Sequence, residues 1–295
     1  MKSLQKLILA FLCSFGMLVQ AQGFDDVTIE INKLSDHVYM LTGAGGNIGV
    51  SVGDDGAIVI DDQFAPLTPK IVSAIKTLTD KSIKFLVNTH WHGDHTGGNA
   101  NMNKQGATII AHDNVRKRLE ETPNRDETMR PKEALPVITF NDKLSIFING
   151  EKAAIFHVDH AHTDGDALLF FTQSNVLHTG DVYFNGMYPY IDLDSGGSVN
   201  GYIDAIKNTL MLINNDTKII PGHGKLSNKA GYEEFLTMLE ALKTNVLNEI
   251  ANGKTEDEVA ANTNITKVYD FVGYSWDFIS SEKIRRTFYK SLKEK

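Results

Sequence analysis

The sequence has 295 residues, of which 42% are hydrophobic and 22% are charged, a composition typical of a globular protein with a sizeable core. Its formal net charge of −8, with no cluster of lysines and arginines, argues against a nucleic-acid-binding protein, because an acidic surface repels phosphates. A small anionic substrate is not excluded, since a bound metal ion can dominate the local field.

The N-terminal segment has the parts of a secretory signal peptide. Lys2 and Lys6 are basic, residues 7–12 are apolar, and residues 19–21 offer small side chains for cleavage. The apolar run is too short to span a bilayer. We therefore expect residues 1–21 to be removed, leaving a periplasmic or secreted chain with no stable membrane anchor; an uncleaved amphipathic anchor is the alternative. Cys13, the one cysteine, would be lost with this segment.

Strands and a helix alternate in the first half of the mature chain. Apolar runs predict strands at residues 38–41, 49–52, 57–60, 85–87 and 108–110. A helix is expected to begin with Thr68 as its N-cap and Pro69 at its first position. A second helix is predicted at 114–121, followed by an exposed loop at 122–136. This order is typical of an α/β fold.

The second half repeats the pattern. A hairpin is expected around Asn149-Gly150, the strongest short hairpin signal. Strands are predicted at residues 144–148, 153–158, 167–171, 175–177 and 218–220. Helices are predicted at 198–213, at 229–251, and from a capping box at 255–258. Strand-rich segments that are each followed by helices predict one domain, 22–295, with two sheets face to face and helices outside.

The segment His-Trp-His-Gly-Asp-His at residues 90–95 places three imidazoles and a carboxylate directly after a buried strand. Imidazole and carboxylate are natural zinc ligands in hydrolytic sites. His90 and His92 are two positions apart, so an extended backbone points both the same way. Gly93 and the pair Gly97-Gly98 are expected to permit a tight loop that brings Asp94 and His95 to a neighbouring position. A coincidental polar loop is the weaker alternative.

This segment resembles the signature of the metallo-β-lactamase superfamily. Three later motifs appear in the order expected for that family, at residues 160–163, 178–181 and 221–224. The resemblance extends over most of the mature chain and implies a four-layer αβ/βα sandwich, with two zinc ions per chain in a shallow groove at one edge. It implies that the first zinc is held by His90, His92 and His162, that the second is held by Asp94, His95 and His223, and that Asp181 bridges both.

The positions of the later residues support this assignment. His162 lies in a loop between two predicted strands, Asp181 follows a strand, and His223 follows a strand in a Pro-Gly turn. Strand ends are where loops can converge on one site. Taken alone, each residue would more commonly be structural; as a set they complete two coordination spheres.

Other polar residues have structural or open interpretations. Three histidines are interpreted as structural: His37, His178, and His112 as the cap of the next helix. His157 and His160 flank the ligand loop and at most support a ligand. For three aspartates, orientation of a ligand and a role in a turn stay open: Asp61, Asp164 and Asp166.

The resemblance also implies a mechanism. Two zinc ions that share a water lower its pKa and hold a bridging hydroxide that attacks a carbonyl. Asp94, the predicted catalytic residue, would bind the second zinc and orient the hydroxide. We expect a secreted zinc-dependent hydrolase that opens a small ester, lactone or lactam and has no nucleic-acid partner.

The substrate is less constrained. Lactamases with a thiolate ligand have Cys where Asp181 stands, and those with the same Asp-His pair typically have Ser; Asp181 resembles the bridging residue of the glyoxalase II, lactonase and phosphodiesterase branches. Export favours a lactam or lactone over a cytosolic glutathione thioester. The aromatic segment 183–190 either lines a substrate groove or packs as a surface loop. The alternative function is an iron-dependent redox enzyme of this fold, similar to sulfur dioxygenases.

Overall fold

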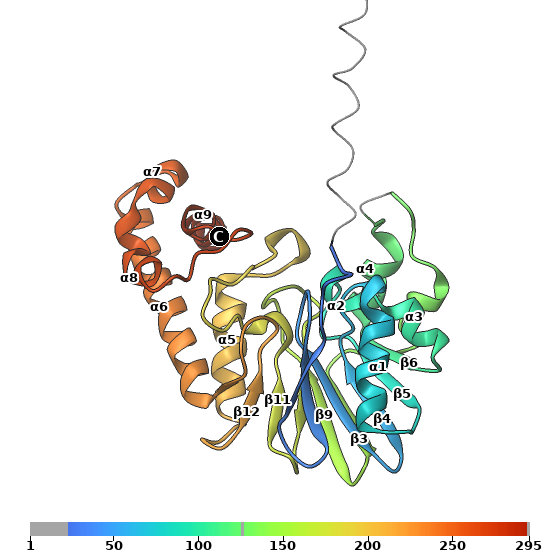
Figure 1. Ribbon diagram of the computed structural model, residues 1–295. Helices are drawn as coiled ribbons and strands as arrows, with labels where there is room; N and C mark the ends of the chain where they lie inside the picture. The colour runs from blue at the N-terminus through green and yellow to red at the C-terminus, as the bar shows by residue number, and fades with distance from the viewer. Residues whose placement is uncertain (1–22, 125–126, 294–295) are drawn as a thin grey trace, which may run out of the picture.

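The computed structural model describes residues 23–124 and 127–293, so the predicted signal peptide and Cys13 lie outside the described residues. Two sheets pack face to face, and helices cover both outer faces (Figure 1). The predicted four-layer α/β sandwich is confirmed.

The first sheet has seven strands in chain order. They are β1 (Glu30–Lys33), β2 (Val38–Thr42), β3 (Ile48–Gly53), β4 (Gly56–Ile60), β5 (Ile83–Val87), β6 (Thr108–His112) and β7 (Ile138–Phe140). The strands from β1 to β4 pair antiparallel, and those from β4 to β7 pair parallel. Helix α1 (Thr68–Leu78) makes the crossover from β4 to β5 that a parallel pair requires.

The second sheet has the order β13-β12-β11-β10-β9-β8. Its strands are β8 (Lys143–Ile148), β9 (Glu151–His157), β10 (Ala167–Phe171), β11 (Val176–His178), β12 (Lys218–Ile220) and β13 (Ser227–Asn228). Its one parallel pair, β11 with β12, is joined through helix α5 (Val199–Leu210).

Three helices border the loops of the first sheet, and four more form a C-terminal lobe in the described chain. The α-helices near the first sheet are α2 (Gly93–Thr96), α3 (Asn99–Lys104) and α4 (Asp113–Glu121). Those of the C-terminal lobe are α6 (Lys229–Ala251), α7 (Glu256–Ala261), α8 (Lys267–Phe271) and α9 (Ser281–Lys293), drawn in orange and red in Figure 1. The 3-10 helices are η1 (Ala65–Leu67), η2 (Lys132–Ala134), η3 (Gly180–Val182), η4 (Leu193–Ser195) and η5 (Thr263–Ile265). Within the described residues, no helix combines the length and the apolar character needed to cross a bilayer.

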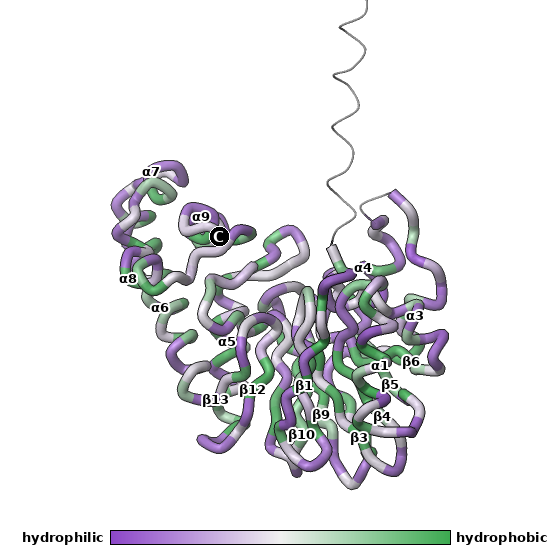
Figure 2. The backbone as a smooth tube through the Cα atoms, in the orientation of Figure 1, coloured by the Kyte–Doolittle hydropathy of each residue, from purple (hydrophilic) through white to green (hydrophobic). Residues whose placement is uncertain are grey.

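The layers follow from residue alternation in the strands. In β4, Ala57 and Val59 pack with Ile71 of α1, whereas Ile58 and Ile60 pack against the second sheet. Both faces of this strand are buried, as its continuous apolar run predicts. Full burial of each such side chain contributes about 1.5–3 kcal/mol. Figure 2 shows the hydrophobic colouring gathered on the strands and on the helix faces that cover them.

Several element ends differ from the sequence expectations. Thr68 is not an N-cap: η1 precedes α1, so Thr68 is already helical, and its buried hydroxyl has no hydrogen-bond partner. Helix α5 begins after Ser198, whose side chain accepts a hydrogen bond from Gly201 N, and it ends before residue 213. The end of the predicted exposed loop 122–136 contains η2 and buries Leu135.

Three short edge strands were not expected from the sequence. They are β1, β7 and β13, of four, three and two residues. All four residues of β1 are exposed, so the strand lacks the apolar alternation by which strands are recognised. Backbone pairing to β2 forms it.

Candidate metal centre

The structure brings all seven predicted ligands together in two adjoining clusters. They come from loops that follow different strands of both sheets, as expected for strand ends that meet at one edge. The first cluster is His90, His92, His162 and Asp181, and the second is Asp94, His95 and His223. In each cluster the potential ligand atoms all lie within 4.8 Å of one another.

Asp181 lies between the two clusters. Its Oδ2 is 3.7 Å from His90 Nε2 and 3.5 Å from His162 Nε2. Its Oδ1 is 3.0 Å from His95 Nε2 and 3.4 Å from His223 Nε2. One carboxylate therefore presents one oxygen to each cluster, an arrangement that suits two metal ions sharing a ligand.

The inward-facing nitrogens fit metal ions better than they fit one another. His90 Nε2 is buried and has no hydrogen-bond partner. His162 Nε2 faces His92 Nδ1 at 2.8 Å, and His95 Nε2 faces His223 Nε2 at 3.4 Å. When two imidazole nitrogens face one another, only one of them can donate a hydrogen bond to the other, whereas a cation between them would be coordinated by both lone pairs.

The outward-facing nitrogens of these histidines have acceptors that orient the rings. Such acceptors fix the tautomer, so that the inner nitrogen keeps its lone pair for a metal. The contacts are His92 Nε2 with Asp192 Oδ2 at 3.0 Å, His95 Nδ1 with Asp61 Oδ2 at 2.7 Å, and His162 Nδ1 with the Tyr190 carbonyl oxygen at 2.7 Å.

Asp61 supports ligands of both clusters. It contacts His95 directly, and it accepts hydrogen bonds from Thr89 N at 2.8 Å and from Thr89 Oγ1 at 2.7 Å. Because the Thr89 hydroxyl donates to Asp61, it can accept from His90 Nδ1, which lies 3.0 Å away. Asp61 has a φ of +62°, a left-handed conformation that costs energy outside glycine. Of the two sequence interpretations of Asp61, the contacts favour orientation of a ligand.

The ionisation of the histidines differs between the clusters. Burial lowers the pKa of His90 well below its usual value and that of His162 to about 4, so both imidazoles are neutral. Burial by itself would also lower the pKa values of His95 and His223, but the neighbouring carboxylates, above all Asp181, have a larger effect in the opposite direction. They raise the pKa of His95 well above its usual value and that of His223 to about 9.

Asp94 is ionised despite its burial. Burial by itself would raise the pKa of this carboxyl group, but His95 and a hydrogen bond from His223 lower it to about 2. Asp94 Oδ2 lies 3.3 Å from His223 Nε2, and the Asp94 side chain is 28% exposed. An anionic carboxylate is thus partly open to solvent beside the clusters.

The sequence also left open whether Asp164 and Asp166 orient a ligand or form a turn, and both make contacts that hold the loop between β9 and β10, which contains His162. Asp166 accepts hydrogen bonds from Thr163 N and Thr163 Oγ1, and burial raises the pKa of Asp166 to about 8. Asp164 pairs with Arg118 through two hydrogen bonds of 2.6 and 2.7 Å. Neither belongs to a cluster.

The structural interpretations of two histidines are confirmed. His112 accepts a hydrogen bond from Asn114 N and so caps α4. His178 is fully buried, with Nε2 3.1 Å from the Asn47 carbonyl oxygen. His37 likewise contacts only the Val52 carbonyl oxygen, through Nδ1, among the contacts of its ring in the described structure.

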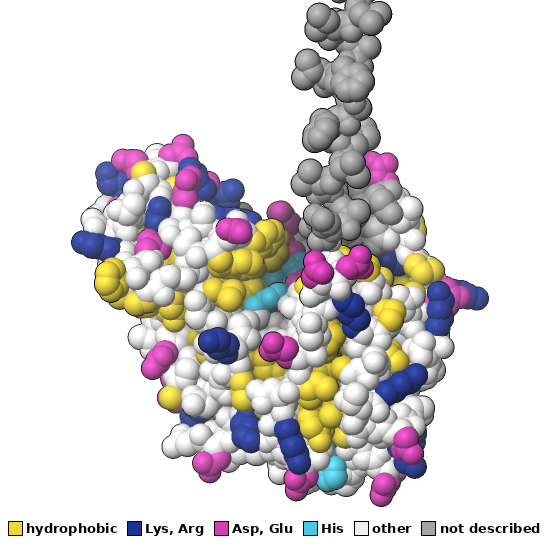
Figure 3. Space-filling view, in the orientation of Figure 1, with side chains coloured by type: hydrophobic (Ala, Val, Ile, Leu, Met, Phe, Trp, Pro, Cys, Tyr) yellow, Lys and Arg dark blue, Asp and Glu magenta, His cyan; other side chains and the backbone are white. Residues whose placement is uncertain are grey.

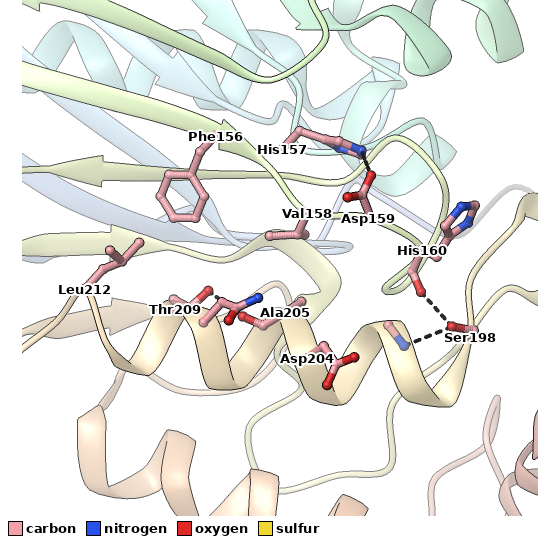
Figure 4. Close-up of a pocket in the computed structure, with 12 residues that line it drawn as sticks. Phe156, His157, Val158, Asp159, His160, Ser198, Asp204, Ala205, Thr209 and Leu212 are labelled. Carbon is pink, nitrogen blue, oxygen red and sulfur yellow. Dashed lines mark hydrogen bonds and ion pairs between the residues drawn. The ribbon is translucent and has the colours of Figure 1, made fainter.

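His157 and His160 line a separate cavity of about 480 Å³ between β9 and α5 (Figure 4). His157 contacts the Asp166 carbonyl oxygen through Nδ1 and Asp159 through Nε2. His160 Nδ1 lies 2.8 Å from the Gly196 carbonyl oxygen. Protein atoms thus contact both ring nitrogens of His157 and Nδ1 of His160, and neither histidine belongs to a cluster.

The aromatic segment 183–190 is mostly packed. Tyr183, Phe184 and Tyr188 are at most 1% exposed. Phe184 nevertheless stacks on His223, with ring centroids 5.0 Å apart. Among the aromatic residues of the segment, only Tyr190 is half-buried, and its ring stacks on His92 of the first cluster.

Asp192 is the supporting residue that sequence reasoning missed. It lies 100 positions after its partner His92 and follows no motif. Asp192 is the N-cap of η4, and its carboxylate accepts a hydrogen bond from Ser195 N at 3.2 Å. The only indication of Asp192 in the sequence is that a polar residue follows the aromatic segment 183–190.

Comparisons with known proteins agree with this geometry. Residues 41–223 match a profile described as "Metallo-beta-lactamase superfamily", a span that includes all seven cluster residues. A type 2 metallo-β-lactamase from Bacillus sp. (strain 170) is 22% identical over 72% of this chain and 83% of its own length. A hydroxyacylglutathione hydrolase from Pelagibacter ubique is 31% identical over 50% of this chain and 56% of its own length.

Solved structures give the same result for the fold. A metallo-β-lactamase from Pontibacter korlensis superposes with a TM-score of 0.62 and 19% identity, over 72% of this chain and 99% of that protein. The profile match, the fold and the His/Asp clusters together show that this chain is a metal-dependent hydrolase and belongs to the metallo-β-lactamase superfamily.

Proposed function

We propose that this protein is an exported hydrolase with two zinc ions, which opens a small ester, lactone or lactam. The observation that carries the proposal is the position of Asp181, with one carboxylate oxygen toward each of two clusters of nitrogen and oxygen donors. Imidazole and carboxylate donors suit zinc in a hydrolytic site.

The first zinc would be held by His90, His92 and His162, the second by Asp94, His95 and His223, and Asp181 would contact both. When bound, zinc supplies a nucleophile at neutral pH by lowering the pKa of water. The chain's own residues do the rest. Asp94 is anionic and partly exposed, so it can accept a proton or a hydrogen bond from the attacking water. Asp61 and Asp192 keep the ligand rings in place.

The relatives point to two kinds of acyl substrate. The name of one contains β-lactamase, and that of the other contains hydroxyacylglutathione. The N-terminal signal pattern favours the first kind, since glutathione is cytosolic. A small lactam or lactone therefore fits both the family and the expected location.

A substrate panel tests the proposal. Zinc-loaded protein would be assayed against a chromogenic lactam, lactone, thioester and phosphodiester. We expect turnover of a lactam or lactone, and a loss of roughly a hundredfold or more in Asp94→Ala or after chelation, because the group that orients the nucleophile or the metal is gone. Asp80→Ala is the matched control, because its side chain is 90% exposed and pairs with Lys81 rather than with a cluster residue.

Two outcomes would contradict the proposal. Hydrolysis that persists undiminished in Asp94→Ala and in chelated protein would rule out metal-assisted chemistry. Iron retained in preference to zinc when both are supplied, with oxygen uptake on a persulfide, would favour the redox alternative.

A further inference from the structure

We propose that three aromatic side chains form a recognition surface for an aromatic group of the substrate, beside the bond that is hydrolysed. This aromatic wall consists of Tyr190, Trp276 and Phe278. The proposal rests on the proposed function, because it names the substrate class that the same site would take. It concerns specificity rather than the chemical step.

The aromatic wall connects the two metal-ligand clusters through successive ring contacts. Tyr190 stacks on His92 of the first cluster, with centroids 5.5 Å apart and an interplanar angle of 25°. Phe278 contacts Tyr190 edge-on at 5.1 Å and Trp276 at 5.7 Å. Trp276 in turn lies 6.5 Å from His223 of the second cluster. A group held on this surface therefore lies alongside both clusters.

Hydrogen bonds hold the wall in one arrangement. The Trp276 indole N–H donates to the Tyr188 carbonyl oxygen at 2.9 Å, and Trp276 N donates to the Ile279 carbonyl oxygen at 3.2 Å. Lys283 donates to the Phe278 carbonyl oxygen, and its ammonium lies 4.0 Å from the Phe278 ring centroid. A rigid aromatic surface binds a ligand at a low cost in conformational entropy.

The wall keeps apolar surface in contact with solvent. Phe278 is 48% exposed, and Trp276 and Tyr190 are half-buried. Figure 3 shows hydrophobic side chains gathered beside histidine atoms that reach the surface, where the surface is hollowed. An exposed apolar patch at the rim of a polar site is typical of a ligand-binding groove.

Two of the three residues belong to the C-terminal lobe. Trp276 and Phe278 lie in the segment between α8 and α9, beyond the residues 41–223 that match the superfamily profile. The clusters are thus supplied by the matched region and most of the wall by the lobe. This division assigns the bond-breaking chemistry to the sandwich and the choice of substituent to the lobe.

Binding of two hydroxamates to zinc-loaded protein tests the wall without turnover. Acetohydroxamate and benzohydroxamate chelate a metal through the same group but differ in a methyl or a phenyl substituent. We expect the wild type to bind benzohydroxamate more tightly. Phe278→Ala should weaken benzohydroxamate by roughly three- to tenfold, the worth of one aromatic contact, and leave acetohydroxamate unchanged. Isothermal titration calorimetry gives both dissociation constants.

Phe271→Ala is the matched control. Phe271 lies in the same lobe and is 91% exposed, and no ring contact joins it to the wall in the described structure. Phe278→Tyr, which keeps the ring, should retain the preference.

The outcomes separate the two proposals. The wall is overturned if the wild type binds the two hydroxamates equally or binds neither, or if Phe278→Ala behaves like Phe271→Ala or weakens both hydroxamates alike. A preserved phenyl preference in a protein that hydrolyses no ester, lactone or lactam would overturn the proposed function and leave the wall standing.

Discussion

At the scale of single residues, the site depends most on Asp181. Its side chain presents one carboxylate oxygen to each cluster, and Tyr202 Oη donates to its backbone carbonyl oxygen at 2.6 Å. Removal of the Asp181 carboxylate would leave the histidines of the two clusters without the anion that contacts both sets. His223, in contrast, belongs to the second cluster alone.

We predict that His223→Ala loses metal chiefly from one site and that Asp181→Ala loses at least as much. The reason is that a bound ion is held by the sum of its ligands, and Asp181 faces both sets. Elemental analysis of the purified variants measures the metal content per chain. Full metal content and activity in both variants would show that the second set of ligands is wrongly assigned.

Asp192 illustrates how an outer residue controls a ligand. It contacts His92 Nε2 at 3.0 Å, and burial would raise its pKa, but His92 and Ser195 lower it, so the carboxylate is anionic. This acceptor keeps a proton on the outer nitrogen of His92 and the lone pair on the inner one.

We predict that Asp192→Ala weakens metal binding by about 10- to 100-fold, the usual effect of losing such an acceptor. Competition with a chromogenic chelator measures the affinity. Asp194→Ala, two positions further on and exposed, is the matched control and should bind metal as the wild type does. Equal affinities for the two variants would assign Asp192 to the stability of η4 rather than to the site.

At the scale of elements, the loops that follow the strands must approach one another closely. Gly222, after β12, shows how little space remains: a Cβ there would lie 2.1 Å from Asp181 Oδ1 and 2.6 Å from the Gly180 carbonyl carbon. At Gly93, by contrast, a Cβ would meet nothing within 4 Å. Glycine is therefore not required at Gly93, which begins helix α2, in which alanine is more favourable than glycine. The close approach expected of this loop is found at Gly97, where a Cβ would lie 2.6 Å from the Gly93 carbonyl oxygen.

We predict that Gly222→Ala displaces Asp181 and lowers metal content and activity, because the added methyl group overlaps the carboxylate. Gly93→Ala makes the same chemical change in open space between two ligands and should keep both properties. Metal analysis and turnover of the best panel substrate compare the pair. Wild-type behaviour of Gly222→Ala would mean that the Pro-Gly turn can move away without cost to the site.

At the scale of the whole molecule, the described structure begins to pack almost where the signal pattern ends. Phe24 contacts Phe64 with ring centroids 5.3 Å apart. Lys70 of α1 donates to the carbonyl oxygens of Phe24, Asp25 and Val27. Removal of residues 1–21 would leave all of these contacts in place.

We predict that the mature protein begins near Gln22 and accumulates outside the cytoplasm. The motivation is the pattern of Lys2, Lys6 and the apolar run before the small residues at 19–21. N-terminal sequencing of protein from the periplasm or the medium tests it. An intact Met1 on the exported protein would support the uncleaved anchor instead.

The sequence by itself determined the parts of the fold and site that rest on local patterns. Continuous apolar runs such as residues 57–60 predict buried strands, because both faces of these strands are covered. The ligand motif at 90–95 and the three later motifs are short and ordered along the chain, so the seven residues could be named without a structure.

The tertiary structure decided what depends on contacts between distant residues. Asp192 contacts His92, which lies 100 positions earlier in the chain. Trp276 contacts His223 although Trp276 lies beyond the matched residues 41–223. Strand β1 is formed by its backbone pairing with β2. No local pattern encodes such contacts, because each residue is recognisable only by its partner. The sequence therefore identifies the ligand residues. The orientation of the ligands and the aromatic wall beside them depend on how the two sheets and the C-terminal lobe pack together.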